Sequence, residues 1–275
     1  TPPMSEINSV KYSSNVEGKY PLSVIIDATR TASVRLESSV WRGAAGIFSI
    51  KISESDWVSL NSVLTTPAFA ALENPEGLPP GTGLRSITLR FAKQRETEKW
   101  AVGAPQGFVA AERIFLNIVD KAIAYPEHAI TISSFDFPVA ASGEVIPFSV
   151  TVKNVGKKEI RISNPRNDVG NPSELVLRGV RTDKPVSQFG PSDYEFWDVD
   201  GDAIDEIKAL SMDNEFISLS PGDSLIVKMH IPSGQLAGRC TMTLRFAFDM
   251  LDKDDKRLGR FELVSEKEKV VLTTE

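Results

Sequence analysis

The chain has 275 residues, of which 41% are hydrophobic and 25% charged, a composition typical of a globular protein that buries a sizeable core. Its length suffices for two domains, and no apolar run approaches the roughly 20 residues that span a bilayer. Residues 1–135 carry 13 basic and 13 acidic side chains, and residues 136–275 carry 18 and 24, so the net charge of −6 lies in the second half. This acidity disfavours nucleic acid as a partner and favours cations or a basic protein surface.

The cysteine content and the first residues bear on the compartment. Cys240 is the single cysteine, so no intrachain disulfide can form, which suits the cytosol or a bacterial periplasmic protein without disulfides. The sequence starts TPPMSEINSV, with Met4 inside it, which indicates a processed or trimmed product. Export is favoured because β-rich modules of the kind described below are common outside the cytoplasm. We therefore expect a periplasmic or extracellular protein.

The first half mixes strands and helices. Alternating apolar residues predict five strands, over residues 21–28, 32–39, 46–53, 84–92 and 98–103. Ser53, followed by Asp56, resembles a capping box, so we expect a helix from about Glu54. A second helix is expected over residues 107–124, with an apolar stripe formed by Phe108, Ala111, Phe115, Ile118 and Ala122. The order β-β-β-α-β-β-α predicts an α+β domain over residues 1–134, a mixed, mostly antiparallel sheet with two helices packed on it.

The second half lacks an amphipathic helix after Phe135. Apolar residues alternate with polar ones in VIPFSVTVKN, KEIRISNP, DSLIVKMHI and RCTMTLRFAFDM, with turn residues between them. In the last of these, five residues fall on one face: Cys240, Met242, Leu244, Phe246 and Phe248. Short alternating strands separated by turns predict an all-β sandwich over residues 135–275.

Two turns in this half match a known kind of module. One strand ends in an Asn-x-Gly turn, and an L-x-P-G-D turn leads into a later strand. This half resembles the Ig-like sandwich modules of bacterial envelope and surface proteins, which implies an Ig-like fold and says little about activity. The residues that carry the match are Asn154, Gly156, Leu219, Pro221, Gly222 and Asp223.

The usual catalytic signatures do not occur. The sequence has no GxSxG, HExxH or CxxC motif and no Gly-rich phosphate loop. His128 and His230 have no nucleophile near them in sequence, although distant residues could still assemble a triad. Cys240 is predicted to face inward as a small hydrophobic residue rather than as a nucleophile. We expect no enzymatic activity and no cofactor.

The most distinctive segment is the acidic stretch YEFWDVDGDAIDEI, residues 194–207. Together with Asp193 it holds seven carboxylates and no basic residue. Asp198, Asp200, Asp202 and Glu206 have the 1, 3, 5, 9 spacing of a calcium loop, but Ala203 stands where such a loop needs glycine. A hairpin turned at Asp200-Gly201, without a metal, is the favoured interpretation.

That interpretation leaves the clustered charge unexplained, because neighbouring carboxylates repel one another. Aromatic residues beside charge are typical of protein contact surfaces. We therefore predict that the segment binds a protein partner with a basic surface, through Tyr194, Trp197, Asp198, Asp200, Asp202, Asp205 and Glu206.

The function that these observations favour is protein binding in a bacterial envelope. A concrete form is an immunity or inhibitor protein that blocks a secreted toxin or enzyme by steric occlusion and charge complementarity. One alternative is a hydrolase with a site in an interdomain cleft lined by His128 and carboxylates. The other is a structural or adhesive surface protein, in which the sandwich serves as a spacer.

Overall fold

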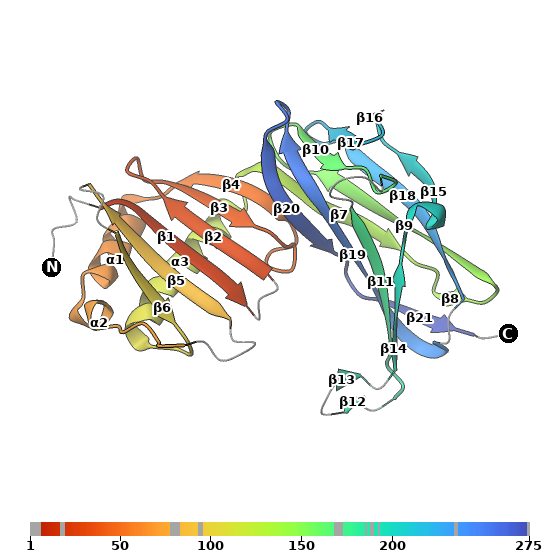
Figure 1. Ribbon diagram of the computed structural model, residues 1–275, viewed down its shortest axis with the longest axis horizontal. Coiled ribbons are helices and arrows are strands. Elements are labelled where there is room, and N and C mark those ends of the chain that lie inside the picture. Colours follow the sequence, from red (N-terminus) through yellow and green to blue (C-terminus); the bar gives the residue numbers. More distant parts are fainter. Residues whose placement is uncertain are drawn as a thin grey trace. The chain divides into compact units, whose positions relative to one another are not determined.

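A computed structural model describes residues 7–16, 20–77, 83–92, 96–167, 173–184, 186–187, 190–191, 193–233 and 236–273. The chain divides into two compact units, one formed by residues 1–42 and 46–127 and the other by residues 43–45 and 128–275. The described chain is mostly strand, and its α-helices belong to the first unit (Figure 1). The predicted boundary at 134/135 falls inside strand β7 (Pro126–Asp136), and it stays a prediction about domain division.

The first unit is an antiparallel sheet with helices on one of its faces. Its strands lie in the order β4-β3-β2-β1-β5-β6, and every neighbouring pair is antiparallel. The elements are β1 (Ile7–Val16), β2 (Tyr20–Ile26), β3 (Thr31–Leu36), β4 (Ala45–Lys51), α1 (Glu54–Leu64), α2 (Pro67–Ala70), β5 (Leu84–Phe91), β6 (Glu96–Ala101) and α3 (Gln106–Ala122). The five predicted strands and two predicted helices correspond to β2–β6, α1 and α3.

Strand β1 lies at the centre of this sheet, between β2 and β5, and the sequence analysis missed it. Its inward positions are Val10, Tyr12 and Ser14, all buried. Because one of the three is a serine and the outward residues Ser9, Lys11, Ser13 and Asn15 are all polar, hydropathy shows too few apolar residues to mark a strand. The short helix α2 was missed as well.

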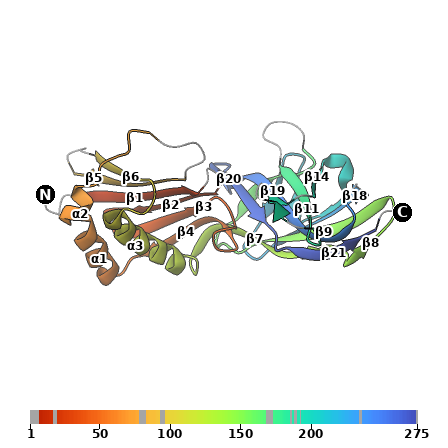
Figure 2. The same cartoon turned by 90° about the horizontal axis from the view of Figure 1, so that it is seen from below.

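The helices cover one face of the sheet (Figure 2). Helix α1 begins as predicted, since the hydroxyl of Ser53 accepts a hydrogen bond of 3.1 Å from the backbone N–H of Asp56. Helix α3 buries the whole predicted apolar stripe. The Lys121 ammonium lies 2.8 Å from the Asp56 carboxylate and so links the two helices. On the opposite face of the sheet, the described residues form no helix.

A carboxylate, Glu112, is buried within the apolar face of α3. One of its oxygens accepts a hydrogen bond of 2.8 Å from the Tyr12 hydroxyl, and the other lies 2.5 Å from Arg85. The Tyr12 ring also stacks on Phe115 at 5.1 Å. Burial of the Tyr12 hydroxyl, together with the nearby Glu112 charge, raises the pKa of Tyr12. The buried Glu112 carboxylate therefore has an ion-pair partner and a hydrogen-bond donor. Proteins bury a charged group when it has such partners.

The second unit is a β-sandwich. One layer has the strand order β15-β18-β9-β7, and the other has the order β14-β11-β19-β10-β17-β16, with β20 and β21 also paired to β19. Its strands are β7, β8 (Ala140–Ala141), β9 (Val145–Asn154), β10 (Ile160–Ser163), β11 (Glu174–Arg181), β12 (Val186–Ser187), β13 (Gly190–Pro191), β14 (Tyr194–Asp198), β15 (Ile204–Lys208), β16 (Ser211–Met212), β17 (Phe216–Leu219), β18 (Ser224–Pro232), β19 (Gly238–Asp252), β20 (Arg257–Val264) and β21 (Glu268–Leu272).

The side chains that alternation predicts to face inward do form the core of the sandwich. Strand β19 buries Cys240, Met242, Leu244, Phe246 and Phe248, as expected. The inward residues of β9 and β18 are buried in the same way: Ile146, Phe148, Val150, Val152, Leu225, Val227, Met229 and Ile231. A two-layer sandwich with inward alternation from both layers is confirmed, and its strand pairs are antiparallel apart from the short parallel pair of β8 with β21.

The two turns that suggested an Ig-like module meet in space. The backbone N–H of Asn154 donates to the carbonyl of Asp223 at 3.0 Å, and Gly222 N–H donates to the carbonyl of Asn154 at 3.0 Å. The Asn154 side-chain oxygen also accepts a hydrogen bond of 2.8 Å from the N–H of Gly156. The end of β9 and the turn before β18 therefore form one hydrogen-bonded corner.

Candidate protein-contact surface

The acidic segment is not a hairpin. Strand β14 pairs with β11 in one layer of the sandwich, whereas β15 pairs with β18 in the other layer. Between them a 3-10 turn, Gly201–Ala203, starts at Asp200, whose side chain accepts a hydrogen bond from Ala203 N–H. Val199 and Ile204, on either side of the turn, are buried. The prediction of a hairpin turned at Asp200-Gly201 is therefore wrong. The segment instead crosses from one layer of the sandwich to the other, and the burial of Val199 and Ile204 holds it there.

Five of the seven carboxylates have partners of their own in the chain. The contacts are Asp193 with Lys184 at 2.6 Å, Glu195 with Leu236 N–H at 3.1 Å, Asp200 with Ala203 N–H at 3.3 Å, Asp205 with His230 at 2.7 Å, and Glu206 with Lys228 at 2.7 Å. The hydrogen bond from Lys228 lowers the pKa of Glu206. Asp198 and Asp202 are exposed, and neither has a polar partner among the described residues. Lysine side chains thus pair with two of the seven carboxylates, Asp193 and Glu206.

Trp197 does not lie on the surface. It is 8% exposed, and its side chain points into the sandwich beside Gly179 of β11. A strand places alternate side chains on opposite faces, so Tyr194 and Trp197, three positions apart, point in opposite directions. The expectation that Trp197 is an exposed anchor for a partner is therefore wrong.

The exposed aromatic residues of β14 are Tyr194 and Phe196, at 56% and 55%. Their ring centroids lie 5.5 Å apart at an interplanar angle of 74°, an edge-to-face pair. The guanidinium of Arg178, on β11, lies 5.6 Å from the Phe196 ring and 6.0 Å from the Tyr194 ring. We call these three residues the aromatic–arginine surface. Phe196 and Arg178 were not among the predicted contact residues, although strand alternation from Tyr194 points to Phe196.

The backbone of β14 is open on one side. Arg181 N–H donates to the carbonyl of Asp193 and Val199 N–H donates to that of Leu175, so odd-numbered residues of β14 bond to β11. The N–H and C=O groups of Tyr194, Phe196 and Asp198 therefore point to the other side, where no described strand pairs with β14. An edge strand with exposed aromatic residues can accept a further strand from a partner.

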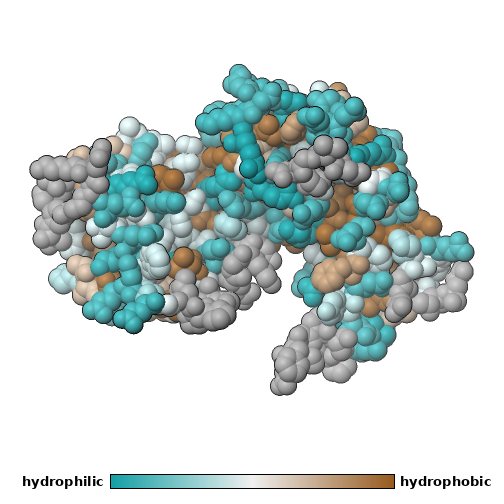
Figure 3. Space-filling view, in the orientation of Figure 1, coloured by the Kyte–Doolittle hydropathy of each residue, from teal (hydrophilic) through white to brown (hydrophobic). Residues whose placement is uncertain are grey.

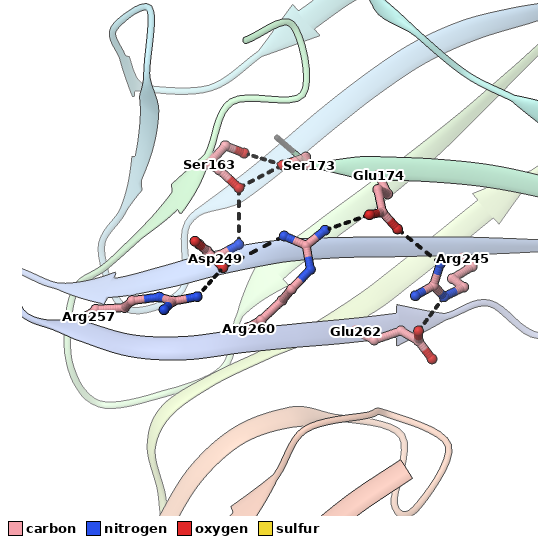
Figure 4. A network of polar contacts seen from close by, with 8 residues as sticks. All are labelled: Ser163, Ser173, Glu174, Arg245, Asp249, Arg257, Arg260 and Glu262. Carbon is pink, nitrogen blue, oxygen red and sulfur yellow. Dashed lines mark hydrogen bonds and ion pairs between the residues drawn. The ribbon is translucent and has the colours of Figure 1, made fainter. Parts of the chain in front are cut away.

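Farther along this face of the sheet, charged side chains form ion pairs with one another. Arg245 contacts Glu174 at 3.3 Å and also pairs with Glu262, and Asp249 lies 3.2 Å from Arg257 (Figure 4). The backbone N–H of Asp249 donates to the Ser163 hydroxyl at 3.1 Å. These charged side chains satisfy one another. The aromatic–arginine surface differs from this region because Arg178 has no carboxylate partner among the described residues.

The calcium-like spacing does not gather its carboxylates. Glu206 is turned to Lys228 and Lys208, and Asp200 caps the 3-10 turn. Within the described residues, no group of three or more His, Cys, Asp or Glu side chains could hold a metal ion.

The residues considered for catalysis lie apart from one another. His230 Nδ1 lies 2.7 Å from Asp205, and within the described ranges no hydroxyl or thiol bonds to the ring. Cys240 is 1% exposed, and burial raises the pKa of its thiol. It is thus the inert core residue that alternation predicted. His128 lies in β7, half-buried.

Comparisons with known proteins identify no relative. No family model and no curated protein matches the chain. Among solved structures, the chain is similar to AvmM, which catalyses macrocyclization in alchivemycin A biosynthesis, at 14% identity and a TM-score of 0.27, over 52% of this chain and 88% of that one. It is similar to PapD-like domain 7 of human CEP192 at 15% identity and 0.24, over 52% and 84%. It is also similar to BcpA, the major pilin subunit of Bacillus cereus, at 8% identity and 0.19, over 97% and 64%.

These scores are too low to identify a shared overall fold, so the sandwich assignment rests on the strand order itself. In the described part of the chain, no helix is long and apolar enough to cross a membrane.

Proposed function

We propose that this protein is a non-catalytic binding protein of a bacterial envelope, periplasmic or extracellular, and that the aromatic–arginine surface contacts its protein partner. The observation that carries the proposal is the edge-to-face pair of Tyr194 and Phe196, half exposed beside Arg178 on an edge strand. Aromatic residues and arginine are the residue types that most often dominate binding energy at protein interfaces. Exposing two rings together costs free energy in water that a partner would recover.

The charge around this surface sets the kind of partner. Asp198 and Asp202 are exposed near the aromatic pair in sequence and lack a described partner, so the surroundings favour a basic surface. The partner in this proposal is a secreted toxin or enzyme, which the protein would inhibit by covering its active-site rim. Asp200, Asp205 and Glu206, which have partners in this chain, would contribute through the local field rather than by direct contact.

The test compares two variants of the intact protein. In Tyr194→Ser/Phe196→Ser both exposed rings are lost, and Leu210→Ser removes an apolar side chain that is 84% exposed elsewhere. Each protein is immobilised, and proteins retained from an extract of the source organism are quantified by mass spectrometry. We expect a secreted basic protein that wild type and Leu210→Ser retain and the double variant loses. Equal retention by all three would refute a role for this surface.

A further inference from the structure

The free edge of β14 differs from three other edge strands of the second unit. An edge strand can recruit another chain, and proteins protect such edges by short length, lysine, proline or an irregular register. Strands β8 and β16 have two residues each, and the pairing of β15 with β18 shifts register between Ile204 and Glu206. Strand β14 has five residues in continuous register with β11 and contains neither lysine nor proline. The edge of β14 is therefore suited to the addition of a strand, whereas the other three are not.

The backbone of β14 presents regularly spaced hydrogen-bonding groups on this edge. Tyr194, Phe196 and Asp198 direct their N–H and C=O groups away from β11, and among the described strands none pairs with them there. Groups that recur at every second residue have the spacing of an antiparallel ladder, in which two opposed residues exchange both of their hydrogen bonds. An added antiparallel strand would thus exchange two hydrogen bonds with each of these three residues.

The side chains of the same three residues define what the added strand has to carry. Tyr194, Phe196 and Asp198 are all exposed and lie on one face of β14. The side chains of an added strand that oppose them would lie on the same face, about 5 Å away between Cβ atoms. Apolar residues match the two rings, and a basic residue matches Asp198, which has no polar partner among the described residues. The surface of the second unit shows both hydrophobic and hydrophilic patches (Figure 3).

We propose that the protein partner adds one of its own segments to this sheet as an extended strand, antiparallel to β14. From its N-terminus to its C-terminus the segment reads basic-x-apolar-x-apolar, with the basic residue opposite Asp198 and the apolar residues opposite Phe196 and Tyr194. This inference rests on the proposed function, because it assigns the binding mode and the partner's sequence pattern to the same surface. Backbone hydrogen bonds then supply part of the affinity, and the alternate side chains supply the specificity.

The experiment titrates the whole chain with a synthetic peptide of this pattern, acetyl-Ser-Lys-Thr-Val-Thr-Tyr-Ser-amide, and follows backbone amides by NMR. Binding should be saturable and should slow hydrogen exchange at Tyr194, Phe196 and Asp198. The amides of Glu195 and Trp197 point to β11, so their exchange should change much less. No saturable binding up to about 5 mM peptide would overturn the proposal. Binding that leaves exchange at Tyr194, Phe196 and Asp198 unchanged would also overturn it.

Two N-methylated peptides test the backbone contact directly. The valine N–H would donate to the carbonyl of Phe196, so N-methylation of the valine should weaken binding at least about tenfold. The nitrogen of the preceding threonine would point away from β14, so N-methylation there should weaken binding less than about threefold. The two peptides carry the same added group and differ only in its position. Equal affinities of the two peptides would overturn strand addition.

A charge reversal tests the register. Asp198→Lys should weaken the lysine peptide at least about fivefold at low salt, and replacement of the peptide's lysine by glutamate should restore binding to this variant. Asp202→Lys is the matched control, because Asp202 is exposed but lies in the 3-10 turn after β14, and it should leave the affinity unchanged. Equal effects of the two reversals would overturn the assigned register.

Failure of strand addition can be distinguished from failure of the proposed function. Suppose that Tyr194→Ser/Phe196→Ser loses the basic protein retained from the extract, while both N-methylated peptides bind equally. The surface then acts through its side chains alone, which overturns strand addition and leaves the proposed function standing. A dimer of the free chain at micromolar concentration, dissociated by the same double variant, would show that a second copy occupies the edge and would overturn the proposal. We expect sedimentation to show no such dimer.

Discussion

The side-chain amide of Asn154 donates a hydrogen bond of 2.8 Å to the carbonyl of Leu219, which joins the end of β9 to the end of β17 inside the sandwich. Asn154 is 0% exposed, and its amide also donates to the carbonyl of Lys158 at 3.0 Å. One asparagine thus satisfies backbone groups from two separate turns. Because Asn154 is fully buried, its amide supplies both carbonyls with a hydrogen-bond donor from inside the sandwich.

Asn154→Ala should therefore lower the free energy of unfolding by about 2–3 kcal/mol, since it leaves buried backbone groups without partners. Urea denaturation measures the change. Asn8→Ala, at an exposed position of β1, is the control and should change stability by less than about 0.5 kcal/mol. Equal effects of the two substitutions would mean that the Asn154 corner is not a stabilising element.

Alternation and periodicity predicted the parts of the fold that depend on local pattern. The α3 stripe, the Ser53 cap and the inward residues of β19 all follow from spacing that a single element imposes on its own sequence. Strand β1 was not predicted because one of its inward residues, Ser14, is polar. The burial of this strand depends on the neighbouring strands β2 and β5 rather than on its own residues.

The acidic segment shows what local pattern cannot decide. The dipeptide Asp200-Gly201 is equally compatible with a hairpin turn and with a 3-10 turn. The outcome depends on non-local pairing, β14 with β11 and β15 with β18, which no local signal reports. The partners of the carboxylates are equally distant, as with Asp205 and His230. By contrast, the outward pairing of Tyr194 with Phe196 was available from strand alternation alone.

The ion pair between Asp56 and Lys121 should make stability depend on pH. The hydrogen bond from Lys121 holds the pKa of Asp56 below its ordinary value of 3.8. Since the folded pKa is lower than the unfolded one, the carboxylate stabilises the fold above about pH 4, and this contribution is lost as the pH falls through the folded pKa. Asp56→Asn should be less stable than wild type by about 0.5–1 kcal/mol at pH 7, with the difference shrinking toward about pH 2.

Urea midpoints measured at a series of pH values test this. Asp202→Asn serves as the control, because Asp202 is exposed and has no partner among the described residues, so its effect should stay close to zero throughout. A gap between wild type and Asp56→Asn that is independent of pH would show that the carboxylate charge is not what stabilises the helix pair.

Calcium should not stabilise the protein. Glu206 faces Lys228 and Lys208, and Asp200 is engaged by Ala203 N–H, so a cation would have to compete with existing contacts for these oxygens. Thermal midpoints with millimolar calcium and with excess chelator should agree. A tight site at 100 times its dissociation constant would add about 2.7 kcal/mol. An upward shift that Asp200→Asn abolishes would show that the loop rearranges to bind the ion.

Adjacent residues of β14 should respond in opposite ways to truncation. Trp197 packs inward beside Gly179, so Trp197→Ala should lower the free energy of unfolding by about 3–5 kcal/mol through the cavity it leaves. Phe196 is exposed, so Phe196→Ala should change stability by less than about 0.5 kcal/mol. If the aromatic–arginine surface contacts the partner, Phe196→Ala should instead weaken binding by about 2 kcal/mol, chiefly through faster dissociation.

Urea denaturation and partner dissociation rates, measured on the same two variants, check both halves of this prediction. The assay for Trp197→Ala has to be run well below its thermal midpoint, so that any loss of binding reflects the surface and not unfolded protein. Unchanged dissociation in Phe196→Ala, with the fold intact, would exclude the aromatic pair from the interface. A large loss of stability in Phe196→Ala would mean that its ring supports the sheet rather than a partner.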